Sequence, residues 1–433
     1  MKKHLLSTIL LIGIISILLV SCNTNAEASK LEYKINDDGR SITITGIGEY
    51  VRTDVDIPGT IDGYTVTAIA PKAFSKSNIT SIALPKTLEE IGYEAFFDCK
   101  ELRVVRFPWG NKSIKKLESR TFKGCTALHT VDMPECLEEI SDVVFYGCEY
   151  LVNIEVPKSV KAIGSNTFES CYRLQKIELP DGIKSIEPCL FRNCKSLKKI
   201  TLPKNLESIG KSAFQYCFNL SGSIVIPNSV TSIGASAFDN CQRIEELILP
   251  TGITKINDYS FVGCIALREL IIPEGVTELG NYAFDACYSL EKLSLPSTLR
   301  NMGMYSLTGA LNVQNIEVSA DNPAYCSIDG NLYSKNGELL IQYALGKPEK
   351  EFSIPSHVKI IGKGAFIYAQ YLEIVNIPKS VTTIRPSAFT ECRLLTAINY
   401  EGTVAEWVTI AKDPSWNYRC GDYKVYCSNG ITK

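Results

Sequence analysis

Cysteine is the residue type with the greatest chemical potential in this chain, because sixteen cysteines occur among its 433 residues. A thiolate can ligate zinc, act as a nucleophile or form a disulfide. Zinc is disfavoured, since the sequence holds no Cys-x-x-Cys pair and only three histidines. Ten of the cysteines recur at a nearly constant interval: Cys99, Cys125, Cys148, Cys171, Cys194, Cys217, Cys241, Cys264, Cys287 and Cys392.

The regular spacing of these ten cysteines predicts buried, reduced thiols. Each stands three residues after a phenylalanine, so every copy occupies the same place in a repeated unit. A continuous column of cysteines cannot pair uniformly without straining the stacked units. We therefore interpret these side chains as small buried apolar groups. Cys420 and Cys427 fall outside the pattern, and a disulfide between them remains an open alternative at this point.

Acidic side chains are the next candidates, because two carboxylates in a cleft can act as general acid and base. The glutamate pairs at 89–90, 138–139 and 245–246 lie in or near repeated positions, which is typical of a solvated edge. A hydrolase site would therefore have to use the non-repeating segments, with these acids: Asp329, Glu338, Asp413 and Asp422. The sequence brings no two of them together and shows no phosphate-binding loop. We predict no catalytic residue, no metal and no cofactor.

The elements that would position any site come from one repeated unit. Its prolines follow one another at intervals of 23 residues, as at Pro134, Pro157, Pro180 and Pro203. Before Pro157, the residues Leu151, Ile154 and Val156 are spaced as in a short strand with one apolar face. Proline ends such a strand because it has no N–H to donate to the ladder.

A unit of this size cannot bury its own apolar face, but stacked units can. After the proline, Val160 and Ile163 return apolar side chains to the inside, and Gly164 is expected to permit a tight turn. The segment from Phe168 to Cys171 is expected to form a helical or 3₁₀ turn. Stacking predicts an internal aromatic spine made of Phe96, Phe122, Phe145, Phe168, Phe191, Phe214, Phe238, Phe261, Phe284, Phe366 and Phe389.

These residues closely resemble the BspA-like (bacterial surface protein A-like) class of leucine-rich repeats. The pattern Ile-Gly-x-x-Ala-Phe-x-x-Cys stands here at 91–99 and again at 233–241. The resemblance implies a β-rich leucine-rich-repeat solenoid of about 23-residue units, with short strands, helical or 3₁₀ turns and a cap at each end. It also implies a secreted or surface-bound protein associated with adhesion to host proteins, cells or other microbes.

The start of the chain is interpreted as a targeting signal followed by a flexible tether. Two lysines precede an apolar run over residues 5–20, which is short for a transmembrane helix, so residues 1–21 fit a secretory signal peptide. The run ends in Leu-Val-Ser-Cys, which resembles the lipobox of bacterial lipoproteins and predicts lipidation of Cys22. Residues 22–30 are small and polar, as a flexible tether should be. We expect a protein anchored by lipid in the bacterial cell envelope, on its outer surface.

The remaining chain divides where the repeat is interrupted. The expected order is an N-terminal cap at 31–57, repeats at 58–320, a β-hairpin island at 321–350, repeats at 351–398 and a C-terminal cap at 399–433. Asp38-Gly39 is expected to turn a hairpin in the first cap, and Trp416 is expected to cover the last unit. The island contains Asp329-Gly330 and Asn336-Gly337, which suit a type I′ turn. It is either a structural insert or a flap that contacts a ligand.

The surface most suited to a partner lies on the first strand of the middle units. Two residues before each repeat proline the outward column is mostly polar, but three consecutive units carry Val225, Ile248 and Ile271. Glu246 and Glu269 stand beside them, and an apolar stripe rimmed by charge is typical of a contact surface. The alternative is that these residues do not bind a partner and occur there only because β-branched residues favour strands.

Recognition of an extracellular protein or glycan, in adhesion, is therefore the leading hypothesis. A net charge of −2 provides no basic patch for nucleic acid. A second candidate surface is the edge just past the cysteines, where Tyr172, Phe218 and Tyr288 would stack on sugars. The remaining alternatives are the hydrolase in the island and C-terminal cap, and a passive spacer.

Overall fold

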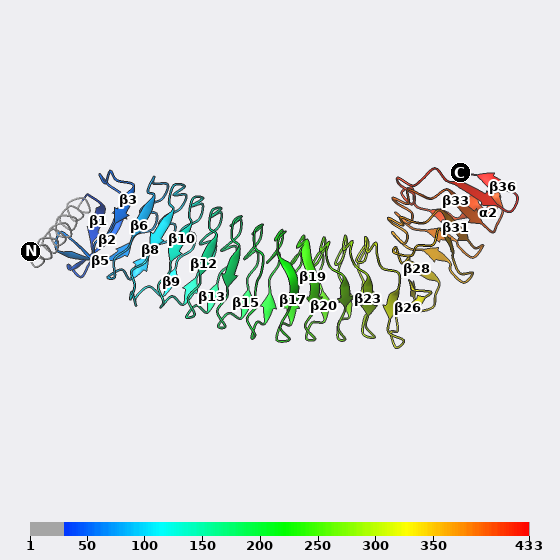
Figure 1. Cartoon of the computed structure of the whole chain (residues 1–433), viewed down its shortest axis with the longest axis horizontal. Coiled ribbons are helices and arrows are strands. Elements are labelled where there is room, and N and C mark those ends of the chain that lie inside the picture. Colours follow the sequence, from blue (N-terminus) through cyan, green and yellow to red (C-terminus); the bar gives the residue numbers. More distant parts are fainter. Residues whose placement is uncertain (1–29, 433) are drawn as a thin grey trace, which may run out of the picture. The chain divides into compact units, whose positions relative to one another are not determined.

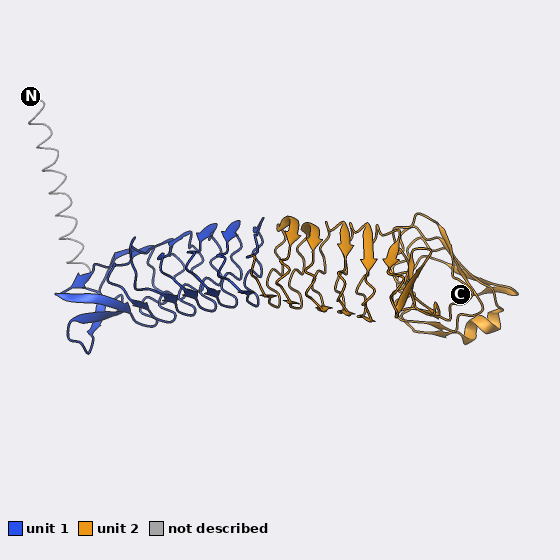
Figure 2. Ribbon diagram, turned by 90° about the horizontal axis from the view of Figure 1, so that it is seen from below, with its two compact units in different colours: residues 1–203 blue, residues 204–433 orange. Residues whose placement is uncertain are grey.

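The computed structural model describes residues 30–432, and the chain divides into two compact units, 1–203 and 204–433 (Figure 2). The predicted signal peptide 1–21, Cys22 and all but the last residue of the tether lie outside the described residues. Within each unit the chain winds into successive coils, and most coils contribute two short strands (Figure 1). The predicted repeat solenoid is confirmed.

In unit 1, neighbouring coils pair through parallel strands on two faces. The first face carries β3 (Asp54–Asp56), β6 (Ser81–Ala83), β8 (Val104–Arg106) and β10 (Thr130–Asp132), and then β12 (Asn153–Glu155) with β14 (Lys176–Glu178). The second face carries β9 (Lys116–Leu117), β11 (Glu139–Ile140) and β13 (Ala162–Ile163), and also β15 (Ser185–Ile186). In β12 only Ile154 is buried while both neighbours are exposed, so the predicted alternation is confirmed.

Unit 1 begins with a sheet of a different kind. It contains β1 (Glu32–Ile35), β2 (Ser41–Gly46), β4 (Thr60–Ile61), β5 (Tyr64–Ile69) and β7 (Glu90–Ile91). Strands β1 and β2 form the antiparallel hairpin expected around Asp38-Gly39. Ile42 and Ile44 of β2 are fully buried, whereas Ile35 of β1 is half exposed. The hairpin therefore covers the first coil mainly with its second strand.

Unit 2 repeats the two-face arrangement. Its first face carries β17 (Ser221–Val225), β19 (Arg243–Ile248), β21 (Glu269–Ile271), β23 (Lys292–Leu295) and β25 (Ile316–Val318) in one parallel sheet. Its second face carries β16 (Ser208–Ile209) with β18 (Ser232–Ile233), and β20 (Lys255–Ile256) with β22 (Glu278–Leu279) and β24 (Asn301–Met302).

The interruption near residue 320 is an antiparallel meander that joins the sheet of the later coils. Its strands are β26 (Tyr325–Ile328), β27 (Asn331–Ser334) and β28 (Leu339–Gln342). Asp329 and Gly330 both have positive φ between β26 and β27, as a type I′ turn requires. Strand β28 then pairs in parallel with β30 (Ile360–Ile361), which is followed by β32 (Thr383–Ile384) and β34 (Ala411–Lys412).

The C-terminal end closes over the last coil. A second sheet runs through β29 (Glu351–Ser353), β31 (Ile374–Ile377), β33 (Ala397–Tyr400), β35 (Lys424–Cys427) and β36 (Gly430–Thr432). The helix α2 (Val404–Thr409) starts at a capping box made by Thr403 and Glu406 and buries Trp407. Trp416 meets Phe389 edge-on with ring centroids 5.7 Å apart, so it covers the aromatic core as predicted.

The predicted phenylalanine spine is present in both units. In unit 1 the stacked rings run from Phe74 to Phe191 with centroids 5.3–5.7 Å apart, and Phe74 is a member that the sequence analysis did not include. In unit 2 the rings from Phe214 to Phe284 are 5.1–5.5 Å apart. Tyr343 extends the later stack next to Phe366. Such offset stacking adds to the large apolar area that each ring buries.

The ten repeat cysteines are buried free thiols, as predicted. They are more than apolar groups, because the thiol donates a hydrogen bond to the phenylalanine carbonyl of the preceding coil. Cys148 donates to Phe122 at 3.3 Å and Cys171 donates to Phe145 at 3.2 Å. Burial raises the pKa of Cys287 to about 12. The Cys287 thiol therefore stays protonated near neutral pH, and the sulfur hydrogen bonds join neighbouring coils.

Cys420 and Cys427 are both free thiols, so the structure contains no disulfide between them. Cys420 donates to the Phe389 carbonyl at 3.3 Å, which is the same bond that the repeat cysteines make. It is therefore the last member of the cysteine column. Cys427 lies at the end of β35, beside Gly430 of β36.

Two local expectations are wrong. The Phe-x-x-Cys segments are successive β-turns rather than helical or 3₁₀ turns, because residues on both sides of the phenylalanine are left-handed. Asn166 and Ser170, which flank Phe168, have φ of 59° and 61°. A left-handed residue interrupts the backbone geometry that a helix needs.

Gly164 does not serve a positive-φ turn. Its special property is close approach: a Cβ placed there would lie 2.4 Å from Asp142 Oδ1 and 2.6 Å from the Ser141 carbonyl carbon. The neighbouring coil therefore packs against the bare backbone at this position, which is a different use of glycine.

Candidate functional site

The predicted apolar stripe consists of Val225, Ile248 and Ile271 and lies on β17, β19 and β21 of unit 2. The three side chains are 57%, 45% and 60% exposed. Val225 is in register with Ile248, and the pairing of Glu246 with Glu269 places Ile248 beside Ile271. The buried face of the same strands carries Ile224, Leu247 and Leu270. The stripe is thus a continuous apolar surface on a backbone that the coil interior holds in place.

The charged residues beside the stripe also lie where the spacing puts them. Glu246 and Glu269 are neighbours on adjacent strands, and both are exposed. Lys292 on β23 is 3.9 Å from the Glu269 carboxylate. Like charges opposite one another on a sheet repel. The stripe is therefore bordered by an acidic edge that a positively charged partner would relieve.

The second predicted surface, the edge past the cysteines, is not a shared platform. The Tyr172 ring is covered by Lys195, whose Nζ lies 4.7 Å from its centroid. Phe218 packs against Tyr216, with centroids 5.9 Å apart. Of the three predicted aromatics only Tyr288 counts as exposed, at 43%. These contacts fit loop aromatics that pack on their neighbours.

A different row of aromatic residues was missed by the sequence analysis. Tyr259 and Tyr282 stack with centroids 5.1 Å apart, and Tyr305 follows at 5.2 Å. Lys363 Nζ lies 4.7 Å from the Tyr305 centroid at the far end. The 23-residue spacing of these tyrosines, two positions before the spine residue, was a usable signal.

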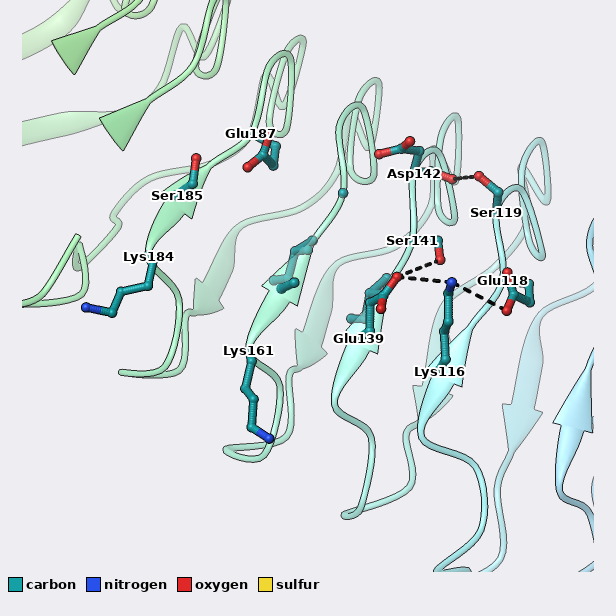
Figure 3. Close-up of a pocket in the computed structure, with 14 residues that line it drawn as sticks. Lys116, Glu118, Ser119, Glu139, Ser141, Asp142, Lys161, Lys184, Ser185 and Glu187 are labelled. Atoms are coloured by element: carbon teal, nitrogen blue, oxygen red, sulfur yellow. Dashed lines mark hydrogen bonds and ion pairs between the residues drawn. The ribbon is translucent and has the colours of Figure 1, made fainter. Parts of the chain in front are cut away.

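Unit 1 contains a polar hollow on its second strand face, with a volume of about 580 Å³ (Figure 3). Its lining comes from four successive coils, at β9, β11, β13 and β15 and the residues that flank these strands. The hollow is lined by Lys116, Glu118, Ser119, Glu139, Ile140, Ser141, Asp142, Lys161, Ala162, Ile163, Gly164, Lys184, Ser185 and Glu187. Its volume is within the range of small-molecule sites.

Ion pairs within the hollow balance much of its charge. Lys116 lies between two carboxylates, 3.2 Å from Glu139 and 3.6 Å from Glu118 (Figure 3). The hydrogen bond to Glu139 raises the pKa of Lys116. Lys161 pairs at 2.8 Å with Glu138, whose pKa this contact lowers. Both shifts favour the charged forms of Lys116 and Glu138.

Two of the acids proposed for a hydrolase site, Glu338 and Asp413, have side-chain partners of their own. Glu338 pairs with Lys359, and Asp329 lies in the hairpin turn between β26 and β27. Asp413 accepts hydrogen bonds from the hydroxyl and amide of Ser415, which lower its pKa and favour the ionised form. Within residues 30–432, no group of three or more histidine, cysteine or acidic side chains is arranged to hold a metal ion. No helix in that range is long and apolar enough to span a membrane.

Comparison with solved structures supports the fold. A leucine-rich repeat protein from Bacteroides ovatus aligns with a TM-score of 0.63 and 24% identity, over 92% of this chain and 98% of its own. A leucine-rich cell surface protein from Faecalibacterium prausnitzii aligns with a TM-score of 0.51 and 24% identity, over 89% of this chain and 96% of its own. A search of curated proteins found no match.

The repeat sequence itself matches a known family. The model of the BspA type leucine-rich repeat region matches in six copies, over residues 67–136, 115–245, 220–336 and 346–409. These segments span most of the chain and include the phenylalanine spine, the ten repeat cysteines, the apolar stripe and the polar hollow. The resemblance seen in the sequence is confirmed, and the chain belongs to the BspA-type leucine-rich repeat family.

Proposed function

We propose that this protein is a bacterial surface adhesin that binds an extracellular protein through the apolar stripe of unit 2. The family and the neighbouring folds suggest a repeat-based recognition role and a bacterial surface location. The observation that carries the more specific proposal is the alignment of three exposed β-branched side chains on adjacent strands. Exposed apolar residues clustered within a polar rim are what protein-binding surfaces bury.

The chemistry around the stripe favours a protein segment with both apolar and basic side chains. Apolar groups of the partner would cover Val225, Ile248 and Ile271, and a basic group would relieve the repulsion between Glu246 and Glu269. Strands β19 and β21, which carry Ile248 and Ile271, present no free edge, because each is paired on both sides within one sheet. Side-chain contact, rather than strand addition, is therefore the expected mode of binding.

Replacing Ile248 and Ile271 together by lysine should weaken adhesion at least tenfold, or about 1.4 kcal/mol. Both side chains are exposed, so the coils should remain folded and melt at an unchanged temperature. The measurement uses the purified full-length protein against an array of purified extracellular proteins, followed by titration of each protein that binds.

The matched control is the double variant Thr130→Lys with Thr201→Lys, which adds the same two charges at exposed first-face positions of unit 1. It should bind as the unmodified protein does. Equal binding by a folded stripe variant would remove the stripe as the contact surface. Failure of the unmodified protein to bind any protein on the array would favour a passive spacer.

Anchoring at the surface is proposed from the sequence of the first residues, with Cys22 as the lipidated residue. Several acyl chains on one cysteine would anchor firmly, because each buried CH₂ adds about 0.8 kcal/mol of membrane affinity. The variant Cys22→Ala should leave the precursor uncut and unlabelled in cells that are fed a tagged fatty acid. Normal labelling of this variant would contradict the lipid anchor.

A further inference from the structure

The polar hollow of unit 1 lies where the second face changes from long to short side chains. In β15, the residue just before the buried aliphatic is Ser185. At the same position the preceding coils carry Lys116 in β9 and Glu139 in β11, but Ala162 in β13. Strands β9, β11 and β13 are in register, so these three residues are direct neighbours. Ala162 is exposed and leaves open the space that a long side chain would fill.

The sheet formed by β9, β11 and β13 also ends at the hollow. Strand β13 is the last member of the sheet with β9 and β11, and no ladder joins it to β15 within the described residues. Glu187 follows β15 on the far side of this gap and makes no ion pair within the described part of the chain. On the wall of the hollow, Asp142 Oδ1 accepts a hydrogen bond from the Ser165 amide at 2.7 Å. The second carboxylate oxygen of Asp142 is available to accept a hydrogen bond from a ligand.

The composition of the lining selects the chemistry of a ligand. Three lysines face four carboxylates, and Lys116 and Lys161 are already paired, so neither a strong anion nor a strong cation is favoured. The lining contains no aromatic side chain, and its two isoleucines, Ile140 and Ile163, are buried. An apolar protein anchor would therefore find little to contact. A ligand rich in hydroxyl groups can donate to the carboxylates and accept from lysine and serine.

We propose that the polar hollow of unit 1 is a binding site for a neutral oligosaccharide, which lies over Ala162 between Glu139 and Glu187. Asp142 and Glu187 accept hydrogen bonds from its hydroxyl groups, and Lys116 donates to them. This site is independent of the stripe in unit 2 and gives the protein a second kind of ligand.

The test replaces Ala162 with glutamine, which extends a neutral side chain into the hollow from an exposed position. The control is Ser232→Gln, which makes the corresponding change at the exposed first residue of β18 in unit 2. The probe is a printed array of neutral hexose and N-acetylhexosamine oligosaccharides, with sulfated oligosaccharides and basic peptides as comparison arms. The best neutral oligosaccharide is then titrated by calorimetry.

We expect Ala162→Gln to weaken binding of that oligosaccharide at least tenfold, whereas Ser232→Gln and the stripe double variant bind it normally. In protein labelled with ¹³C-alanine, the Ala162 methyl resonance should shift when the oligosaccharide is added. The proposal is overturned if no neutral oligosaccharide binds, if the sulfated or peptide arm binds instead, or if Ala162→Gln has no effect. Because Ala162→Gln should leave binding to a protein partner intact, its failure is distinguishable from failure of the adhesin proposal.

Discussion

Replacing Phe145 with alanine is expected to lower the free energy of unfolding by about 3–5 kcal/mol. The Phe145 ring is fully buried and stacks on Phe122 and Phe168, with centroids 5.6 Å away on each side. Alanine removes most of the buried area and leaves a cavity between two rings that the neighbouring coils hold apart. Guanidinium unfolding followed by circular dichroism would measure the loss.

The control is Phe145→Leu, which keeps an apolar group of intermediate size. This chain already uses leucine in the spine position at Leu307, which is buried. We expect this change to cost about half as much as alanine, since more of the space stays filled. A loss below about 1 kcal/mol for Phe145→Ala would mean that the coils collapse around the gap, and that the spine contributes little beyond burial.

The second large effect is expected from Gly164→Ala, which adds one methyl group. That methyl would lie 2.4–2.6 Å from Asp142 and Ser141 of the preceding coil, and much of what it meets is backbone. The coils would have to separate, at a cost of roughly 1–3 kcal/mol or more. The Gly164 amide also donates to the Ile140 carbonyl at 2.8 Å, so separation would strain a hydrogen bond between coils. Thermal melting of the purified variant would reveal the change.

Gly252→Ala provides the matched comparison, because its added methyl would be no closer than 3.4 Å to any atom. That variant should melt close to the unmodified protein or slightly above it, since alanine restricts the unfolded chain more than glycine does. Equal melting temperatures for the two variants would show that the backbone approach at Gly164 is not tight in solution.

The repeat made much of this fold predictable from sequence. A fixed interval between prolines, phenylalanines and cysteines determines which side chains stack, and the exposure of Val225, Ile248 and Ile271 followed from strand alternation alone. What escaped prediction depends on contacts between coils. The role of Gly164 arises from the backbone of the preceding coil, and the flanking left-handed residues have many identities, so no single residue type marks them.

The two candidate sites also differ in how far the sequence predicts them. The apolar stripe was found because its residues are apolar, whereas the other residues at the same repeat position are mostly polar. The polar hollow was missed because it depends on short side chains, Ala162 and Ser185, that follow longer ones, and on a break in strand pairing that no residue type marks. Reading the position before each buried aliphatic as a column would have shown the change from Lys116 and Glu139 to Ala162 and Ser185. The end of the ladder at β13 requires the three-dimensional structure.

The left-handed corners impose an order on the way the coils of the solenoid are completed. For a residue other than glycine, the left-handed conformation costs about 1–2 kcal/mol. The amides of Asn166 and Ser170 donate to carbonyls of the following coil, at Pro188 and Arg192, whereas Gly164 donates backward to Ile140. A newly made coil can therefore pair its strand with its predecessor at once, but its corner stays incomplete until the next coil is made. At the corner formed by Glu391, the carbonyl is supplied by Tyr418, so the C-terminal segment must be in place before that corner is complete.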